Sequence, residues 1–244
     1  MPTKINWTQE VWNPVTGCNK NCEFCYARKF AKRLQANPNT KIAHKYRNGF
    51  TPTFHPGELD TPKKWKKPRI VFAPSMGDMF DPAITFKQHC QIFQAMADAA
   101  QHTYLILTKY PENIINFIEK CEDWNPKDWK NVWFGVSVST QKEADKRIQL
   151  LSHIPHCNFF VSVEPILEPI NITSYLDDIH IKWVIGGGLT GKNANKKTMD
   201  WLLELCSTCQ DAKVPFFYKS NGTGNMAFTK YVRQFPDFNY NPIS

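Results

Sequence analysis

Short apolar runs alternate with helical stretches along most of the chain, and this rhythm limits the possible folds more than any other feature of the sequence. The runs are rich in Val, Ile and aromatic residues, as is typical of strands buried on both faces of a parallel sheet. Six runs have this character: 69–75, 103–108, 131–138, 158–164, 181–187 and 214–219. A further short strand is expected near residues 12–16.

The stretches between these runs carry signals for the start of helices. Thr85 and Gln88 have the spacing of a capping box, as do Thr140 and Glu143, and Pro111 suits the first position of a helix. The expected helices span about 27–35, 85–101, 111–121, 140–152 and 198–212. Such alternation implies βαβ units with right-handed crossovers and a parallel sheet.

We therefore predict one α/β domain over residues 1–244, a parallel (β/α) barrel of TIM-like type, complete or partial. A doubly wound open sheet is the alternative. Residues 36–68 are rich in Pro, Asn, Thr and Lys, which predicts a long loop inserted over one face. No apolar run approaches the roughly 20 residues needed to span a membrane, and the first residues lack a signal peptide's apolar region, so we expect a cytoplasmic protein.

Three cysteines, Cys18, Cys22 and Cys25, stand close together just before the first expected helix. In a reducing compartment such thiols bind metal rather than form disulfides, and cysteine thiolates are the usual ligands of iron–sulfur clusters. A structural zinc site requires four ligands, and the fourth would have to come from His44, Cys206 or Cys209. The last two lie among leucines in an expected helix, where cysteine is more often part of the core.

The spacing C-x3-C-x-aromatic-C, with Phe24 at the aromatic position, resembles the signature of the radical S-adenosylmethionine (SAM) superfamily. Nearly the whole chain resembles a phage-associated radical SAM-like family whose members are largely of unknown function. The segments that carry this resemblance are 12–27, 75–80, 107–109, 133–137, 162–165 and 186–188. The chain departs from that family at Gly188-Leu189, where an acidic residue is expected, and at 219–222, where a Lys-Gln-Trp-Gly-like ending is expected.

The resemblance implies a [4Fe–4S] cluster held by the three cysteines, with one iron open to the amino and carboxylate groups of SAM. Reductive cleavage, driven by an external one-electron reductant, would give a 5′-deoxyadenosyl radical that takes hydrogen from a substrate. Phe24 would lie near the adenine, and Asp78 would hold the methionine amino group. The host would be a prokaryote or a phage-infected cell.

In (β/α) barrels the functional groups lie at the carboxyl ends of the strands. On this basis Lys109 and Glu164 are candidate catalytic residues. Lys109 follows the run 103–108, and Glu164 is a carboxylate inside an apolar run, where it is costly unless it is paired or used. The candidate cofactor-binding residues are Phe24, Ser75, Asp78, Ser137, Ser139, Gly186 and Gly187, and the candidate substrate-binding residues are Lys219, Ser220 and Asn221.

Simpler interpretations remain for three of these residues. Asp78 could cap a turn, although Asp81 is better placed to do so; Lys109 could be a solvated turn lysine; and Ser139 could begin a helix.

The chain carries a formal net charge of +8, which favours polyanionic partners. Lys63, Lys64, Trp65, Lys66 and Lys67 could follow phosphates while the indole stacks on a base, although a solvated loop explains them equally well. We therefore expect a nucleic-acid base or nucleotide as the substrate. The alternatives are a small-molecule or peptide substrate, or a non-enzymatic module that is stabilised by metal and binds nucleic acid.

Overall fold

The computed structural model describes residues 5–37, 39–40, 42–154, 158–179, 181–190, 195–220 and 232–238. The chain divides into two compact units, of which the first ends at Asp123 and the second begins at Trp124. The expectation of a single domain stays a prediction. Among the residues described, no helix is both long and apolar enough to cross a membrane.

The first unit is built on three parallel strands that pair in chain order. These strands are β1 (Glu10–Val11), β4 (Ile70–Phe72) and β5 (Thr103–Thr108). Its helices are α1 (Tyr26–Ala36), α2 (Phe86–Ala97) and α3 (Pro111–Glu119). A separate antiparallel pair joins β2 (Val15–Thr16) to β3 (Thr53–Phe54).

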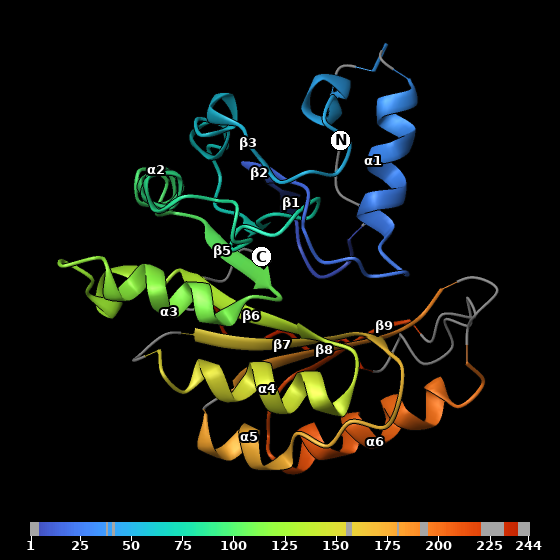
Figure 1. Ribbon diagram of the computed structural model, residues 1–244. Coiled ribbons are helices and arrows are strands. Elements are labelled where there is room, and N and C mark those ends of the chain that lie inside the picture. Colours follow the sequence, from blue (N-terminus) through green and yellow to red (C-terminus); the bar gives the residue numbers. More distant parts are fainter. Residues whose placement is uncertain are drawn as a thin grey trace. The chain divides into compact units, whose positions relative to one another are not determined.

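The second unit has four parallel strands, again in chain order. They are β6 (Val132–Val138), β7 (Asn158–Ile166), β8 (Ile181–Gly188) and β9 (Phe216–Ser220). Figure 1 shows α4 (Gln141–Leu151), α5 (Thr173–Asp178) and α6 (Thr198–Asp211) on one face of this sheet. The 3-10 helix Pro126–Trp129 precedes β6.

Strand order within each unit follows the barrel prediction, because a doubly wound sheet reverses its order at a switch point. The six apolar runs are confirmed as parallel strands. The capping box of Thr85 and Gln88 is also confirmed, as is Pro111 in the first turn of α3. Thr140 caps α4, but the side chain of Glu143 accepts from the Ser139 amide rather than from Thr140, at 2.8 Å.

The expected short strand near residues 12–16 is confirmed in part. Val15–Thr16 is a strand, but it belongs to the antiparallel pair, and the strand that joins the parallel sheet is β1. Pro14 lacks an N–H group and separates the two. The long loop expected at residues 36–68 stays a prediction as an insertion, and this segment contains β3 and three 3-10 helices, Ala43–Tyr46, Pro56–Glu58 and Pro62–Lys64. Within this segment Tyr46 and Phe50 pack with α1 in one buried cluster.

Candidate functional site

The cysteine loop ends at the first turn of α1, and backbone N–H groups point at two of its sulfurs. Cys25 is the N-cap of α1, and its Sγ accepts a hydrogen bond from the Arg28 amide at 3.4 Å. The Sγ of Cys18 accepts from the Lys20 amide at 3.3 Å. Hydrogen bonds to cysteine sulfur are among the contacts that tune metal-bound thiolates.

Two glycines allow the backbone to approach closely where the loop begins. Gly17 has a φ of +84°, and a Cβ there would lie 2.3 Å from the carbonyl oxygen of Thr51. Its amide donates to the Met76 carbonyl at 2.9 Å, and its own carbonyl accepts from the Asp78 amide at 3.1 Å. Gly77 packs against the Gly17 backbone, because a Cβ on Gly77 would lie 2.8 Å from the Gly17 carbonyl oxygen. The entrance to the loop is therefore tied to the segment that follows β4.

Asp81 holds the middle of the loop through Asn19. One carboxylate oxygen accepts from the Asn19 backbone amide and the other from the Asn19 side-chain amide, each at 2.7 Å. The Asp81 side chain also accepts from the Ala83 amide at 3.0 Å, and the residue is completely buried. Asp81 thus caps the turn that the sequence predicts and also binds a residue 62 positions away.

Arg28 holds the loop from the α1 side. Its Nη2 donates to the carbonyl of Cys18 at 3.2 Å and to that of Lys20 at 2.9 Å. The guanidinium carbon lies 5.0 Å from the centre of the Phe50 ring. No sequence motif identifies Arg28 or Asn19 as part of the site, because their partners are defined only by the folded loop.

Burial changes the pKa of one of the three cysteine thiols in the loop. Removal from water raises the pKa of the Cys18 thiol to about 12, and the nearby charge of Asp78 adds to this effect. As a free thiol Cys18 therefore keeps its proton at neutral pH, and metal binding would have to displace that proton.

The donor set fits an iron–sulfur cluster. Three soft sulfur ligands share one loop, and N–H groups point at two of them, which is the kind of contact that tunes such clusters. Within the described part of the chain, no three His, Cys, Asp or Glu side chains are grouped to hold a single metal ion. A cubane differs from a single ion in that each thiolate binds a different iron.

Cys206 and Cys209, considered as zinc ligands, are buried in α6 of the second unit, as expected for core cysteines.

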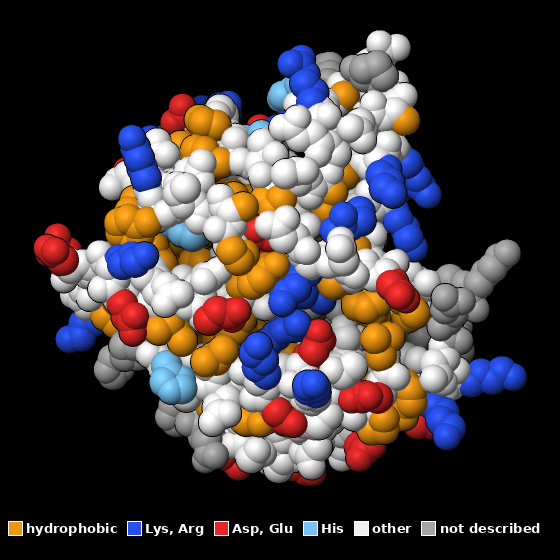
Figure 2. Space-filling view, in the orientation of Figure 1, with side chains coloured by type: hydrophobic (Ala, Val, Ile, Leu, Met, Phe, Trp, Pro, Cys, Tyr) orange, Lys and Arg blue, Asp and Glu red, His pale blue; other side chains and the backbone are white. Residues whose placement is uncertain are grey.

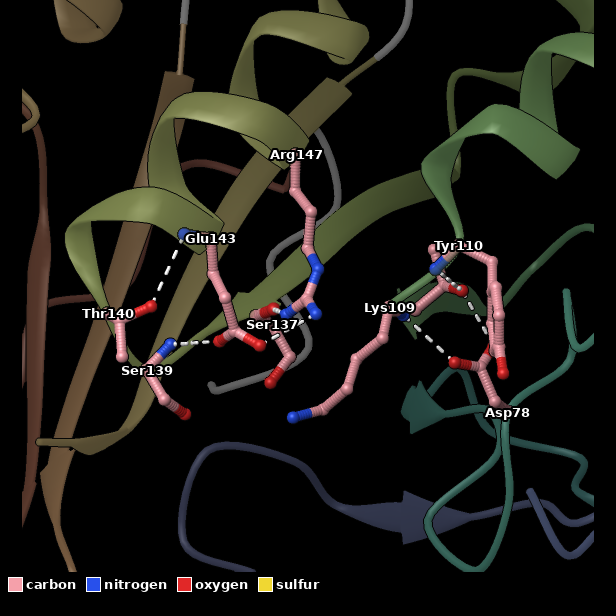
Figure 3. A network of polar contacts seen from close by, with 9 residues as sticks. Asp78, Lys109, Tyr110, Ser137, Ser139, Thr140, Glu143 and Arg147 are labelled. Atoms are coloured by element: carbon pink, nitrogen blue, oxygen red, sulfur yellow. Dashed lines mark hydrogen bonds and ion pairs between the residues drawn. The ribbon is translucent and has the colours of Figure 1, made fainter. Parts of the chain in front are cut away.

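Asp78 lies beyond the end of β4 and binds the end of β5 (right side of Figure 3). Its carboxylate accepts hydrogen bonds from the Thr108 hydroxyl at 2.6 Å, the Lys109 amide at 2.9 Å and the Phe80 amide at 3.1 Å. Burial raises its pKa to about 6, although these bonds act in the opposite direction. Both oxygens thus already have protein partners.

Three other predicted residues of the first unit are tied to the cysteine loop or to α1. The ammonium group of Lys109 lies 5.3 Å from the centre of the Phe24 ring, so these two residues are neighbours. The amide of Ser75 donates to Asn13 at 2.9 Å, and its carbonyl accepts from the Tyr26 hydroxyl.

In the second unit, strand ends bring Glu164 and Lys219 together. Lys219 Nζ lies 2.8 Å from Glu164 Oε1, and the Ser162 hydroxyl donates to Glu164 Oε2 at 3.1 Å. Between their strands, Gly187 leaves the room that the pair needs, because a Cβ there would lie 2.7 Å from Glu164 Oε1. Gly186 instead packs beneath Phe216 and Leu202, where its lack of a side chain serves packing with α6 and β9.

The other predicted residues at this edge are placed differently. Ser220 ends β9 and pairs in register with Gly187. Asn221 lies outside the described residues.

The two predicted serines of β6 and its following turn are buried (left side of Figure 3). The Ser137 carbonyl accepts from Arg147 Nη1 at 2.6 Å, and Arg147 also pairs with Glu143 at 2.7 Å. Ser139 donates its amide to Glu143, but its buried hydroxyl has no hydrogen-bond partner among the described residues.

The basic segment 63–67 is partly neutralised. Lys63 Nζ lies 2.8 Å from Asp98, and Trp65 packs edge-on against His102 with ring centroids 5.6 Å apart. Lys64, Lys66 and Lys67 are exposed.

Residues 2–235 match the family described as Protein of unknown function (DUF5131). No match is found among curated proteins. Among solved structures, a mutant spore photoproduct lyase is similar with a TM-score of 0.54 and 11% identity, over 77% of this chain and 57% of that chain.

Two further structures are similar with lower scores. A spore photoproduct lyase complexed with dinucleoside spore photoproduct gives a TM-score of 0.43 at 10% identity, over 71% of this chain and 54% of that one. SuiB of Streptococcus suis, bound to S-adenosylmethionine, gives 0.46 at 9% identity, over 91% of this chain and 49% of that one. The chain therefore spans about half the length of these proteins, and at such identities the first similarity shows a shared fold alone.

Proposed function

The chain belongs to the DUF5131 family of proteins of unknown function, and we propose that it is a radical SAM enzyme that holds a [4Fe–4S] cluster through Cys18, Cys22 and Cys25. The observation that carries this proposal is the construction of the cysteine loop. Asp81, Arg28 and the Gly17–Gly77 contact fix its backbone from three directions, while N–H groups point at two sulfurs. At the level of fold, the similarity to a spore photoproduct lyase supports membership of the superfamily.

Held by Cys18, Cys22 and Cys25, such a cluster would supply single electrons for the reductive cleavage of SAM, which in turn would allow hydrogen abstraction from a substrate. The protein's residues bind and orient the reactants. In our proposal Phe24, with the Lys109 ammonium group beside its ring, lies against the adenine, and Ser75 is a further contact of the first unit. Asp78 would accept a hydrogen bond from the methionine amino group at Oδ2, which accepts only from the Lys109 amide, whereas Oδ1 accepts from both Thr108 and Phe80.

The other candidate residues belong to the second unit. The Ser139 hydroxyl is the group best suited to a polar atom of SAM, because it is buried and lacks a protein partner in the described chain. Ser137, Gly186 and Gly187 stay weaker candidates, because Gly186 and Gly187 have no side chains and pair with neighbouring strands.

Glu164 and Lys219 offer a carboxylate and an ammonium group at one strand edge, suited to a substrate with both donors and acceptors. We propose a nucleic-acid base or nucleotide as that substrate, on the strength of the +8 charge. A small molecule or a peptide is the alternative, and the association with phages stays a prediction.

Replacing each loop cysteine by Ala tests the proposal. After anaerobic reconstitution, Cys18→Ala, Cys22→Ala and Cys25→Ala should each lose the iron, the visible absorbance and the release of 5′-deoxyadenosine from SAM. Cys90→Ala is the matched control, because that partly exposed cysteine lies on α2. Normal iron content in all three loop variants would contradict the assignment, and zinc in place of iron in the wild type would favour the non-enzymatic module.

A further inference from the structure

Helix α1 continues from the cysteine loop and is strongly basic. It carries Arg28, Lys29, Lys32 and Arg33 within eleven residues and has no acidic residue. The last three are exposed, and Figure 2 shows lysine and arginine side chains gathered along this side of the first unit, at the right of the view. Such a concentration of one sign of charge attracts partners of the opposite sign.

The basic residues share a pocket with two of the proposed cluster ligands. A cavity of about 290 Å³ is lined by Cys22 and Cys25 together with Arg28, Lys29 and Lys32; Asn21 and Glu23 complete it. The charged face of the helix therefore begins at the pocket that Cys22 and Cys25 line.

Two large aromatic side chains lie exposed on the same helix, four residues apart. Tyr26 is 58% exposed and Phe30 is 44% exposed. The Tyr26 hydroxyl donates to the Ser75 carbonyl, so the orientation of its ring is fixed before any partner arrives. Exposed aromatics beside arginine are typical of protein–protein interfaces, where a preformed surface lowers the cost of binding.

We infer that this basic face of α1, comprising Tyr26, Arg28, Lys29, Phe30, Lys32 and Arg33, docks an acidic protein that donates single electrons. The inference rests on the proposed function, because a reductively cleaved cofactor needs such a donor. The donor loses one electron and the cluster gains it, and no bond or proton moves in that step. A nucleic acid would also complement these charges, but it is not an electron donor. The pocket places Cys22 and Cys25 beside the basic face, where a docked electron donor would lie close to them.

Electron-transfer complexes are usually small, weak and guided by charge, so the surface should act mainly on the rate of association. The test uses reduced flavodoxin, an acidic one-electron flavoprotein, and photoreduced deazariboflavin, a small uncharged reductant. The variant is Lys29→Glu/Lys32→Glu, in which both changed residues line the pocket. The matched control is Lys142→Glu/Lys146→Glu, which makes the same charge change at exposed positions of α4 in the second unit.

With the reconstituted protein at low salt, the second-order rate constant for reduction by flavodoxin should fall by about tenfold or more in the α1 variant, and its salt dependence should flatten. The control variant should keep the wild-type rate. Iron content and the rate with deazariboflavin should be equal in all three proteins, which would show that the cluster itself is intact.

Equal flavodoxin rates in the wild type and the α1 variant would overturn the docking surface, and leave the proposed function standing. Loss of DNA or RNA binding in that variant, with its flavodoxin rate unchanged, would also overturn it and identify a nucleic-acid surface instead. A wild type that takes up no iron would refute the proposed function. In that case the affinity for flavodoxin, measured by anisotropy, decides the docking surface alone, and equal dissociation constants for wild type and α1 variant overturn it.

Discussion

Asp78 and Asp81 are two buried carboxylates three residues apart, and they hold different parts of the first unit. Asp78 binds the end of β5 through Thr108 and Lys109. Asp81 binds the cysteine loop through both amides of Asn19. A buried carboxylate that accepts several hydrogen bonds is costly to disturb, because its donors then lose their partners in a site without water.

Replacing Asp81 by Asn should therefore weaken both the fold and the proposed cluster site. The new amide group can no longer accept at one of the two oxygens, so at least one N–H of Asn19 or Ala83 is left unpaired. We expect the free energy of unfolding of the metal-free protein to fall by about 1–3 kcal/mol, and reconstituted iron to be retained less well. Urea denaturation and iron analysis measure the two effects.

Asp123→Asn is the control for this prediction, because it makes the same chemical change at an exposed carboxylate. Asp81→Asn protein with wild-type stability and iron content would show that the loop does not depend on Asp81.

At this scale the sequence predicts the chemistry of residues better than their partners. The spacing of Cys18, Cys22 and Cys25 indicates a cluster loop because all three lie within eight residues. Glu164 and Lys219 are each suggested by a place at a strand end, but only the fold shows that they form a pair across the Gly187 strand. The local signal of Asp81 is a turn, and its contact with Asn19 spans 62 positions, a separation at which no pattern in one sequence is informative.

At the scale of elements, the long apolar strands and capped helices are predictable because each contains several residues with one periodicity. Short elements are not. The strands β1, β2 and β3 have two residues each, too few to show any alternation, and their pairing is set by the chain around them. For the same reason the 3-10 helices between residues 43 and 64 are not visible in a composition that suggests a loop.

The contact of β6 with β7 gives a prediction at this scale. Gly135 lies beneath the ring of Phe160, and a Cβ on Gly135 would lie 2.4 Å from two ring carbons. Gly135→Ala should therefore overpack the second unit and lower its free energy of unfolding by about 1–3 kcal/mol. Urea or thermal denaturation measures the loss.

Gly57→Ala is the matched control, since a Cβ there would meet nothing within 4 Å, and we expect a change within about 0.5 kcal/mol. Equal stabilities of the two variants would mean that Phe160 moves aside without cost.

For the molecule as a whole, the net charge of +8 states how much basic excess exists but not where it acts. In the structure some of these basic side chains are paired with acidic groups and others are exposed to solvent. In the segment 63–67, Lys63 already pairs with Asp98, and its neighbour Trp65 already packs against His102. Lys64, Lys66 and Lys67 are exposed, so only these three are readily available to phosphates there.

If the substrate is part of a nucleic acid bound by this segment, changing Lys64, Lys66 and Lys67 together to Ala should remove up to three phosphate contacts. The slope of log binding constant against log salt should then become shallower by roughly 2–3, because each lost contact reduces it by roughly 0.7–0.9. The measurement is a salt series of DNA and RNA binding for the wild type, this variant and a control with Ala at the exposed Lys120, Lys142 and Lys146. A slope equal to the wild type's in the segment variant would exclude these lysines from binding, and equally shallow slopes in all three proteins would favour a small-molecule substrate. Adding Lys63→Ala should change the slope little further, because Asp98 already competes with phosphate for that ammonium group.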